Sequence, residues 1–103
     1  MNYKVSFRPQ AEADLFGHYQ YISDQAGLAV AEGYIDRIEQ ACLGLATLPF
    51  HGTRRDDIGP GIRTVGFERR ATIVFRVSGR DVTIVRIFYG GQDYERALRP
   101  GPT

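Results

Sequence analysis

A run of apolar side chains at helical spacing over residues 28–48 constrains this fold more than any other feature of the sequence. Every spacing is three or four along Leu28, Ala31, Ile35, Ile38, Cys42, Leu45 and Leu48. Only an α-helix brings all of these positions to one side. A shorter stripe of the same kind precedes it, at Ala11, Leu15, Tyr19, Ile22 and Ala26. Gly27 separates the two stripes, so the sequence predicts a hairpin of two amphipathic helices between Pro9 and Pro49.

Four further segments carry the period-two alternation of half-buried strands, at residues 3–7, 62–67, 71–77 and 82–89. Residues 78–81 read as a short hairpin loop, and residues 50–61 as a turn-rich connection. The predicted order is therefore β-α-α-β-β-β with a short C-terminal tail. This order indicates an α+β fold, with a helical hairpin packed on one face of a four-stranded, mainly antiparallel sheet.

A helical hairpin covers only one face of such a sheet, so the other face must meet water or a partner. Alternation places Thr72, Val74 and Arg76 on that open face. The last strand is apolar on both sides, except for Arg86, and is predicted to be central and covered on both faces.

Length and composition restrict the class of protein. A chain of 103 residues with 43% hydrophobic residues is expected to form one globular domain over residues 1–103. No apolar stretch is long enough to span a bilayer and the N-terminus lacks the apolar block of a signal peptide, so a cytoplasmic location is expected. The single cysteine, Cys42, cannot form an internal disulfide and is expected to be a small buried hydrophobe.

Positive charge is concentrated in the second half of the chain. Residues 1–53 hold three basic and six acidic residues, whereas residues 54–103 hold ten arginines against six acidic residues. Arginine is favoured where planar, multidentate contact with phosphate or carboxylate matters. A solvated surface is the alternative explanation of this asymmetry.

Metal and cofactor chemistry have little support in the sequence. His18 and His51 lie far apart; His18 is expected on the solvent side of its helix and His51 in a turn. No spacing typical of zinc ligands and no glycine-rich phosphate loop is present. Arginines and tyrosines remain as the plausible active groups. They could cleave RNA without a metal or hold a nucleic acid or protein partner.

An ordered set of short segments resembles toxins of the RelE/ParE superfamily of type II toxin-antitoxin systems, and the ParE branch in particular. The segments are VSFRPQAEADL from residue 5, YI at 21, YIDRI at 34, LPFHG at 48, GIR at 61, IVFRV at 73 and VRIFYG at 85. They extend over nearly every predicted element. The element order also matches that fold.

The resemblance implies a toxin that inhibits DNA gyrase when free, is not an enzyme, and is neutralised by a cognate antitoxin with a ribbon-helix-helix DNA-binding domain. No sequence-specific DNA binding by this chain and no membrane association are expected. The superfamily also contains ribosome-dependent messenger RNA endonucleases, which are the alternative. Thr72 and Gln92 stand where those nucleases carry basic residues, and Lys4 is the only lysine. The resemblance therefore favours gyrase inhibition, although Arg54 and Arg55 could replace the nucleases' lysines.

Two surfaces follow as hypotheses. The target is expected to contact the end of the last strand and the following loop, at Arg86, Tyr89, Gln92, Tyr94 and Arg96. The antitoxin is expected to contact the open sheet face, at Arg63, Val74, Arg76 and Val85. In the alternative explanation of the first set, Arg86 pairs with Asp93 or Glu95 and Tyr94 packs the tail onto the sheet.

Overall fold

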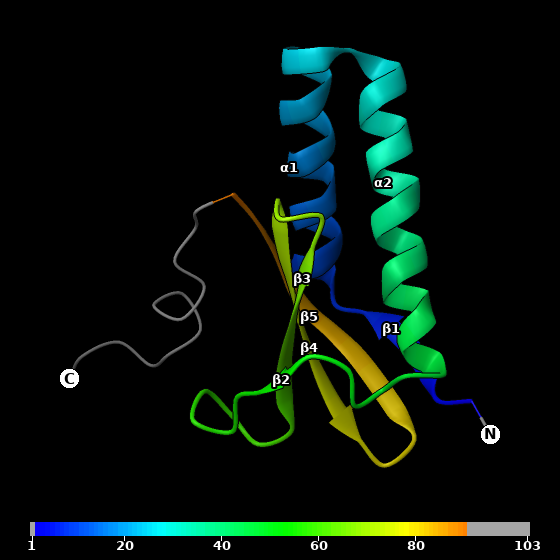
Figure 1. Cartoon of the computed structure of the whole chain (residues 1–103), viewed down its shortest axis with the longest axis vertical. Helices are drawn as coiled ribbons and strands as arrows, with labels where there is room; N and C mark the ends of the chain where they lie inside the picture. Colours follow the sequence, from blue (N-terminus) through cyan, green and yellow to red (C-terminus); the bar gives the residue numbers. More distant parts are fainter. Residues whose placement is uncertain (1, 91–103) are drawn as a thin grey trace.

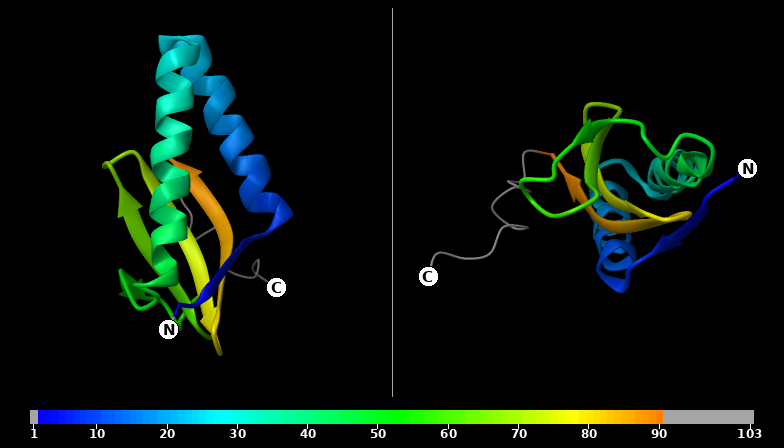
Figure 2. Two further views of the ribbon diagram at one scale, coloured as in Figure 1. Left: turned by 90° about the vertical axis from the view of Figure 1, so that its right-hand side faces the viewer. Right: turned by 90° about the horizontal axis from the view of Figure 1, so that it is seen from below.

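The computed structural model describes residues 2–90 of the chain, which form a helical hairpin standing on a curved sheet (Figure 1). The elements are β1 (Lys4–Phe7), α1 (Pro9–Ala26), α2 (Leu28–Leu43), the 3-10 turn η1 (Gly44–Ala46), β2 (Thr53–Arg54), β3 (Ile62–Phe67), β4 (Ala71–Ser78) and β5 (Asp81–Tyr89). Both helices lie on the same side of the sheet, and their far ends project beyond it (Figure 2). The predicted α+β class and helical hairpin are confirmed.

The strands lie in the order β1-β5-β4-β3-β2. β1 runs parallel to β5, and the pairs β5–β4, β4–β3 and β3–β2 are antiparallel. The sheet thus has five strands, and the prediction of four was wrong because Thr53 and Arg54 pair with Thr64 and Arg63. Gly52 permits this pairing: its φ is 79°, and a Cβ there would stand 2.2 Å from the Thr64 carbonyl oxygen.

The helix boundaries follow the local sequence closely at three of the four ends. Arg8 is extended and α1 begins at Pro9. A backbone N–H at the first helical position has no partner within the helix, so a proline there costs no hydrogen bond. Gly27 has a φ of 98° and joins the two helices. α2 ends at Leu43, earlier than predicted, because the chain tightens into η1 and Thr47 Oγ1 donates to the Gly44 carbonyl oxygen.

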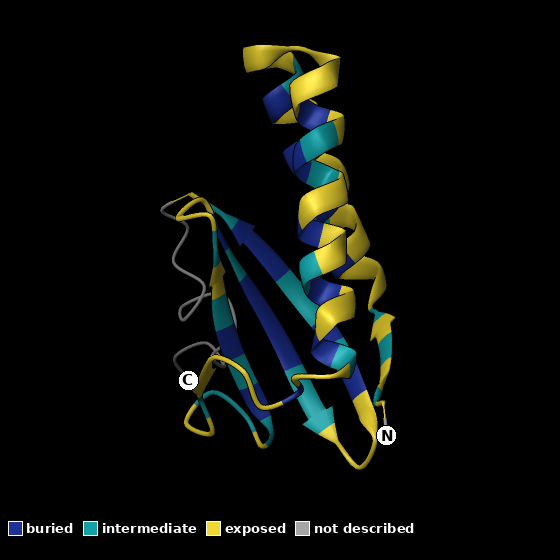
Figure 3. Ribbon diagram, turned by 45° about the vertical axis from the view of Figure 1, so that its right-hand side comes forward, coloured by how far each residue is buried: buried dark blue, intermediate teal, exposed yellow. Residues whose placement is uncertain are grey.

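The main core lies between the sheet and the inner faces of the helices, shown as buried stripes in Figure 3. Its largest fully buried side chains include Tyr34, Ile38 and Phe75. Cys42 is also fully buried, as predicted, and burial raises the pKa of its thiol to about 12, so the thiol stays protonated.

β5 is apolar on both sides because a bulge changes its phase. Ile84 pairs with Phe75 and Arg86 pairs with Val74, which leaves Val85 without a partner residue. Val82 and Ile84 before the bulge, and Ile87 and Tyr89 after it, therefore all pack into the main core. The sequence alternation across this strand is thus interrupted at one position.

The outer face of the sheet is covered over its centre, which corrects the prediction of an open face. Val74 is fully buried in a second cluster with Ile62 and Phe88, against which Ile58 and Val85 pack. Ile58 belongs to the connection between β2 and β3. Val74 is therefore not available to a partner while this connection keeps its place.

We predict that Gly52→Ala destabilises the protein by about 2 kcal/mol or more, because it combines a left-handed backbone with a clash against β3. The matched control is Gly66→Ala, since a Cβ at Gly66 meets nothing within 4 Å and its backbone is not left-handed. Urea unfolding of both variants measures the difference. Equal midpoints for the two variants would contradict the assigned role of Gly52.

Candidate functional site

The candidate site begins where β1 stops covering the edge of β5. The last pair between these strands joins Phe7 to Ile84, and the Arg8 N–H then donates to the Ile84 carbonyl oxygen. Beyond that point α1 replaces the missing strand. Asp14 Oδ2 accepts from the Ile87 N–H at 2.8 Å, and His18 Nε2 lies 3.2 Å from the Ile87 carbonyl oxygen. Both backbone groups of Ile87 are thereby satisfied by side chains.

Asp14 also holds Arg86 in a two-point ion pair. Arg86 Nε and Nη2 donate to the two carboxylate oxygens at 2.8 and 3.0 Å, and the Asp14 side chain is only 15% exposed. The guanidinium carbon lies 4.7 Å from the centroid of the Phe88 ring. The hydrogen bonds from Arg86 to Asp14 raise the pKa of Arg86, so this side chain stays charged.

His18 is buried between α1, α2 and β5, so its predicted place on the solvent side of α1 was wrong. A carbonyl oxygen can only accept, so Nε2 carries the proton that is donated to Ile87. Nδ1 then accepts from the Tyr34 hydroxyl at 3.2 Å. Burial lowers the pKa of His18, against a smaller opposing effect of the Ile87 hydrogen bond, and so favours this neutral state.

Aromatic rings surround this histidine. The Tyr89 ring centroid lies 5.0 Å from that of His18, 5.6 Å from that of Tyr21 and 5.9 Å from that of Tyr34. Burial raises the pKa of Tyr34. A shallow pocket of about 320 Å³ opens beside them, lined by Ala13, Asp14, Gly17, His18, Tyr21, Ile87 and Tyr89.

The chemistry open to this arrangement is limited because its polar groups are engaged. Both His18 nitrogens make hydrogen bonds, and Asp14 neutralises Arg86. Neither group is free to move a proton or to stabilise a charged phosphorane. Within residues 2–90, no three His, Cys, Asp or Glu side chains are grouped to hold a metal ion. The site as described binds the helix to the strand.

The structure brings two of the predicted target-contact residues, Arg86 and Tyr89, to this site. The other three, Gln92, Tyr94 and Arg96, lie outside the described residues, as do Asp93 and Glu95. The alternative in which Arg86 pairs within the protein is correct in kind, although the partner in the described chain is Asp14.

The predicted antitoxin contacts are divided in the structure. Besides the buried Val74, Arg63 donates from Nε to the His51 carbonyl oxygen at 3.1 Å and from Nη2 to that of Phe50 at 2.6 Å. Arg63 therefore holds the connection that follows η1. Arg76 and Val85 are half-buried on the outer face, and Arg76 Nε is buried with no partner among the described residues.

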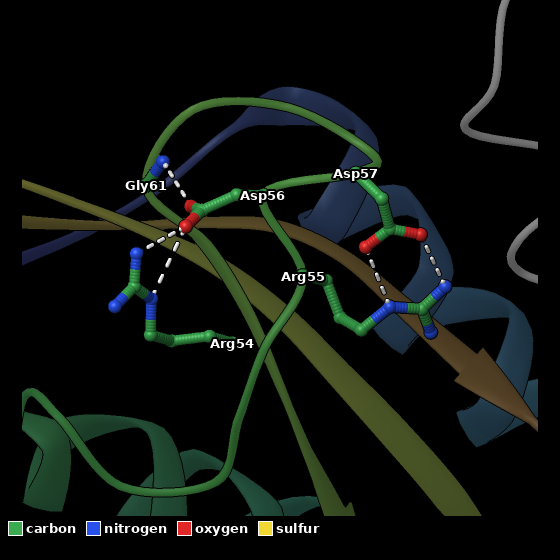
Figure 4. Close-up of polar contacts among 5 residues, drawn as sticks. All are labelled: Arg54, Arg55, Asp56, Asp57 and Gly61. Carbon is green, nitrogen blue, oxygen red and sulfur yellow. Dashed lines mark hydrogen bonds and ion pairs between the residues drawn. The ribbon is translucent and has the colours of Figure 1, made fainter.

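Arg54 and Arg55 are neutralised within their own loop (Figure 4). Arg54 pairs with Asp56, and Arg55 pairs with Asp57 at 2.9 Å. Asp56 also accepts from the Gly61 N–H, and the Arg54 hydrogen bonds are the main cause of the lowered pKa of its carboxyl. The adjacent aspartates therefore compensate the arginines that could have replaced the nucleases' lysines.

Asp14, His18 and Tyr34 are the site residues that the sequence reasoning missed. One signal was available: Ala11, Leu15, His18 and Ile22 have spacings of four, three and four, and all of these residues are buried. A stripe through His18 describes the buried face of α1 better than one through Tyr19 does. No comparable signal predicts the contact of Asp14 with Ile87.

Comparison with known proteins identifies the fold and its family. The family model described as the ParE toxin of the type II toxin-antitoxin system parDE matches residues 5–94. The chain belongs to this family. Its relatives include Toxin ParE3 of Caulobacter vibrioides, 31% identical over 86 residues, which covers 84% of each protein. The resemblance to the ParE branch is thus confirmed.

Solved structures agree with this family assignment. The chromosomal ParDE system from P. aeruginosa contains a chain with a TM-score of 0.74 and 27% identity, covering 85% of this chain and 96% of that one. The RelBE2 toxin-antitoxin complex from Mycobacterium tuberculosis matches at a TM-score of 0.61 and 17% identity, covering 86% and 99%. The second match shows a shared fold alone. None of the helices among residues 2–90 of this ParE-family toxin combines the length and apolar character needed to cross a bilayer.

We predict that Asp14→Ala lowers the free energy of unfolding by about 2–3 kcal/mol, because it leaves the Ile87 N–H and the Arg86 guanidinium without their partner. The matched control is Glu12→Ala, an exposed acidic residue of the same helix, which should change stability by less than about 0.5 kcal/mol. Urea denaturation measures both. A double-mutant cycle with Arg86→Ala should give a coupling of about 1 kcal/mol or more. Zero coupling would contradict the ion pair's contribution.

His18 also predicts a pH dependence of stability. Its pKa in the folded protein is below the ordinary value of about 6.5, so near and below that pH the unfolded chain binds more protons. Stability should therefore fall as the pH decreases from about 7 to 5. His18→Gln should flatten this slope, whereas His51→Gln, in an exposed turn, should retain it. Thermal unfolding across this range tests the prediction, and an unchanged slope in His18→Gln would disprove it.

Proposed function

We propose that this ParE-family toxin inhibits DNA gyrase when free and does so by binding rather than by catalysis. The observation that carries the proposal is the family match over residues 5–94. The geometry is consistent with it, because Arg86 is neutralised by Asp14 and both nitrogens of His18 are engaged. The mechanism that the resemblance to the ParE branch implies, and that we propose for this chain, is the trapping of gyrase on cleaved DNA.

Messenger RNA cleavage on the ribosome is the second candidate, favoured only by the shared fold of the RelBE2 complex. A nuclease of this superfamily would need uncompensated basic groups around the scissile phosphate. Thr72 stands where such a group precedes the apolar run of β4 and pairs there with Phe88. Arg54 and Arg55 are each paired with an aspartate of their own loop. These features support binding over cleavage.

The partner in the absence of a target is proposed to be a cognate antitoxin with a ribbon-helix-helix DNA-binding domain, and both proteins are placed in the cytoplasm. The solved structures that are similar to this chain come from ParDE and RelBE toxin-antitoxin systems, which supports a protein antitoxin. The antitoxin contact stays a proposal for Arg63, and for Arg76 and Val85 on the outer face; it is withdrawn for Val74, which is fully buried.

The test compares two activities of the same preparation. Toxin refolded after separation from its antitoxin is added to purified gyrase with relaxed plasmid, and to ribosomes translating a defined messenger RNA. We expect inhibition of supercoiling with intact messenger RNA, and restoration of supercoiling when the antitoxin is added back. Codon-specific cleavage on the ribosome with normal supercoiling would assign the toxin to the nuclease class instead.

A further inference from the structure

The hairpin tip between β3 and β4 carries two adjacent, exposed arginines, Arg69 and Arg70. Arg54, Arg55 and Arg86 are paired with aspartates, and Arg63 is bound to backbone carbonyl oxygens. Arg69 and Arg70 differ from these residues. Both are exposed, and neither makes a hydrogen bond or an ion pair through its side chain within residues 2–90. Two exposed cations of the arginine-rich half are thus adjacent at one turn.

This turn has a fixed and unusual shape. Glu68 and Arg69 have φ values of 50° and 57°, in the left-handed region that residues other than glycine rarely adopt. The Arg70 N–H donates to the Phe67 carbonyl oxygen and closes the turn. Positive φ at two consecutive residues is common in hairpin turns, but glycine, asparagine or aspartate usually occupies these positions. With a glutamate and an arginine the backbone is strained and must be held by its surroundings, and such strained positions are found preferentially at functional sites.

α2 supplies one of the constraints on the turn. Arg37 Nε and Nη2 donate to the two carboxylate oxygens of Glu68 at 2.7 and 3.0 Å. The ion pair uses the acidic side chain that would otherwise lie next to Arg69 and Arg70. The residue that follows β5 supplies a second constraint, because the Gly90 N–H donates to the Arg70 carbonyl oxygen. The tip is therefore held on two sides, and Arg69 and Arg70 carry more positive charge there than Glu68, which is already paired with Arg37, can balance.

Aromatic side chains adjoin the same end of the sheet. Ala71, which follows the turn, pairs with Tyr89 at the end of β5. The Tyr89 ring contacts that of Tyr21, and Tyr21 is 53% exposed. Arginine and tyrosine are the side chains most enriched among energetically dominant contacts of protein interfaces.

We propose that this end of the sheet is the surface by which the free toxin binds an acidic surface of its protein target. Arg69 and Arg70 bind carboxylates there, and Tyr21 packs beside them. This inference rests on the proposed function, which it deepens by naming the contact and its chemistry. It also moves the main target contact from Arg86, which is neutralised by Asp14, to the turn before β4.

An acidic protein surface fits the tip better than a nucleic acid does. Binding to duplex DNA depends on neutralising several phosphates, whereas two arginines are available here and the net charge of the chain is only +1. The planar guanidinium matches a carboxylate at two points. A turn that is already held in one shape loses little conformational entropy when it docks in that shape.

The experiment compares Arg69→Gln/Arg70→Gln with the parent toxin and with Lys4→Gln/Arg8→Gln. The control removes two exposed cations on and just after β1, at the opposite edge of the sheet. For each protein we would measure the toxin concentration that half-inhibits supercoiling by purified gyrase, growth arrest on induction, and the melting temperature. The hairpin variant should need about tenfold more toxin or more for half-inhibition, at an unchanged melting temperature. The control should behave like the parent.

Each other outcome decides the inference. If the parent inhibits gyrase and the hairpin variant does so equally well, the inference is wrong while the proposed function stands. If the parent leaves gyrase unaffected, the proposed function fails. The inference is then tested by growth arrest alone, and a hairpin variant as toxic as the parent overturns it. If the parent binds plasmid DNA without gyrase and the hairpin variant does not, the partner is a nucleic acid and the proposal of a protein surface is overturned.

Discussion

The structure depends on how the free edge of β5 is satisfied beyond the end of β1. β1 pairs with β5 only as far as Ile84, and an unpaired strand edge inside a packed interface would leave backbone groups without partners. Asp14 accepts from the Ile87 N–H and His18 donates to the Ile87 carbonyl oxygen, so helix α1 takes the place of a strand at this edge. This arrangement fixes where α1 crosses the sheet. Through the His18–Tyr34 hydrogen bond, it also fixes α2.

Ion pairing within the chain accounts for the distribution of charge. The arginine that lies nearest to the helix–strand contact is compensated by Asp14, and those of the β2–β3 connection are compensated by Asp56 and Asp57. Ion pairs of the exposed loop contribute little to stability, yet they remove charge from solvent-facing surface. A sequence count of arginines therefore overstates the charge that a partner can meet. What remains is determined by the pairing geometry.

The sequence predicted the helical hairpin and the three long strands well because their periodicity extends over many residues. It failed where one residue decides the outcome. The Val85 bulge changes the inward face of β5 within a single position, and no alternation pattern predicts it. β2 is only two residues long and depends on the backbone of Gly52, so it read as a turn. His18 was misplaced because a histidine was assumed to face solvent, although its spacing from Leu15 and Ile22 fits the buried stripe. The contact of Asp14 with Ile87 spans most of the chain and is fixed only by the complete fold.

The pairing of the first strand with the last one sets the order in which the chain can fold. Within residues 2–90 β1 pairs with β5 alone, starting at the Lys4–Asp81 pair, so β1 has no partner strand until residues 81–84 have emerged from the ribosome. β5 also supplies core residues to both faces of the sheet. Contacts between residues so far apart in sequence form late and slow folding. During synthesis the helical hairpin can form from local contacts, but its apolar face has no sheet to cover. The nascent toxin is therefore unable to complete its native surface until β5 has been synthesised and has left the ribosome.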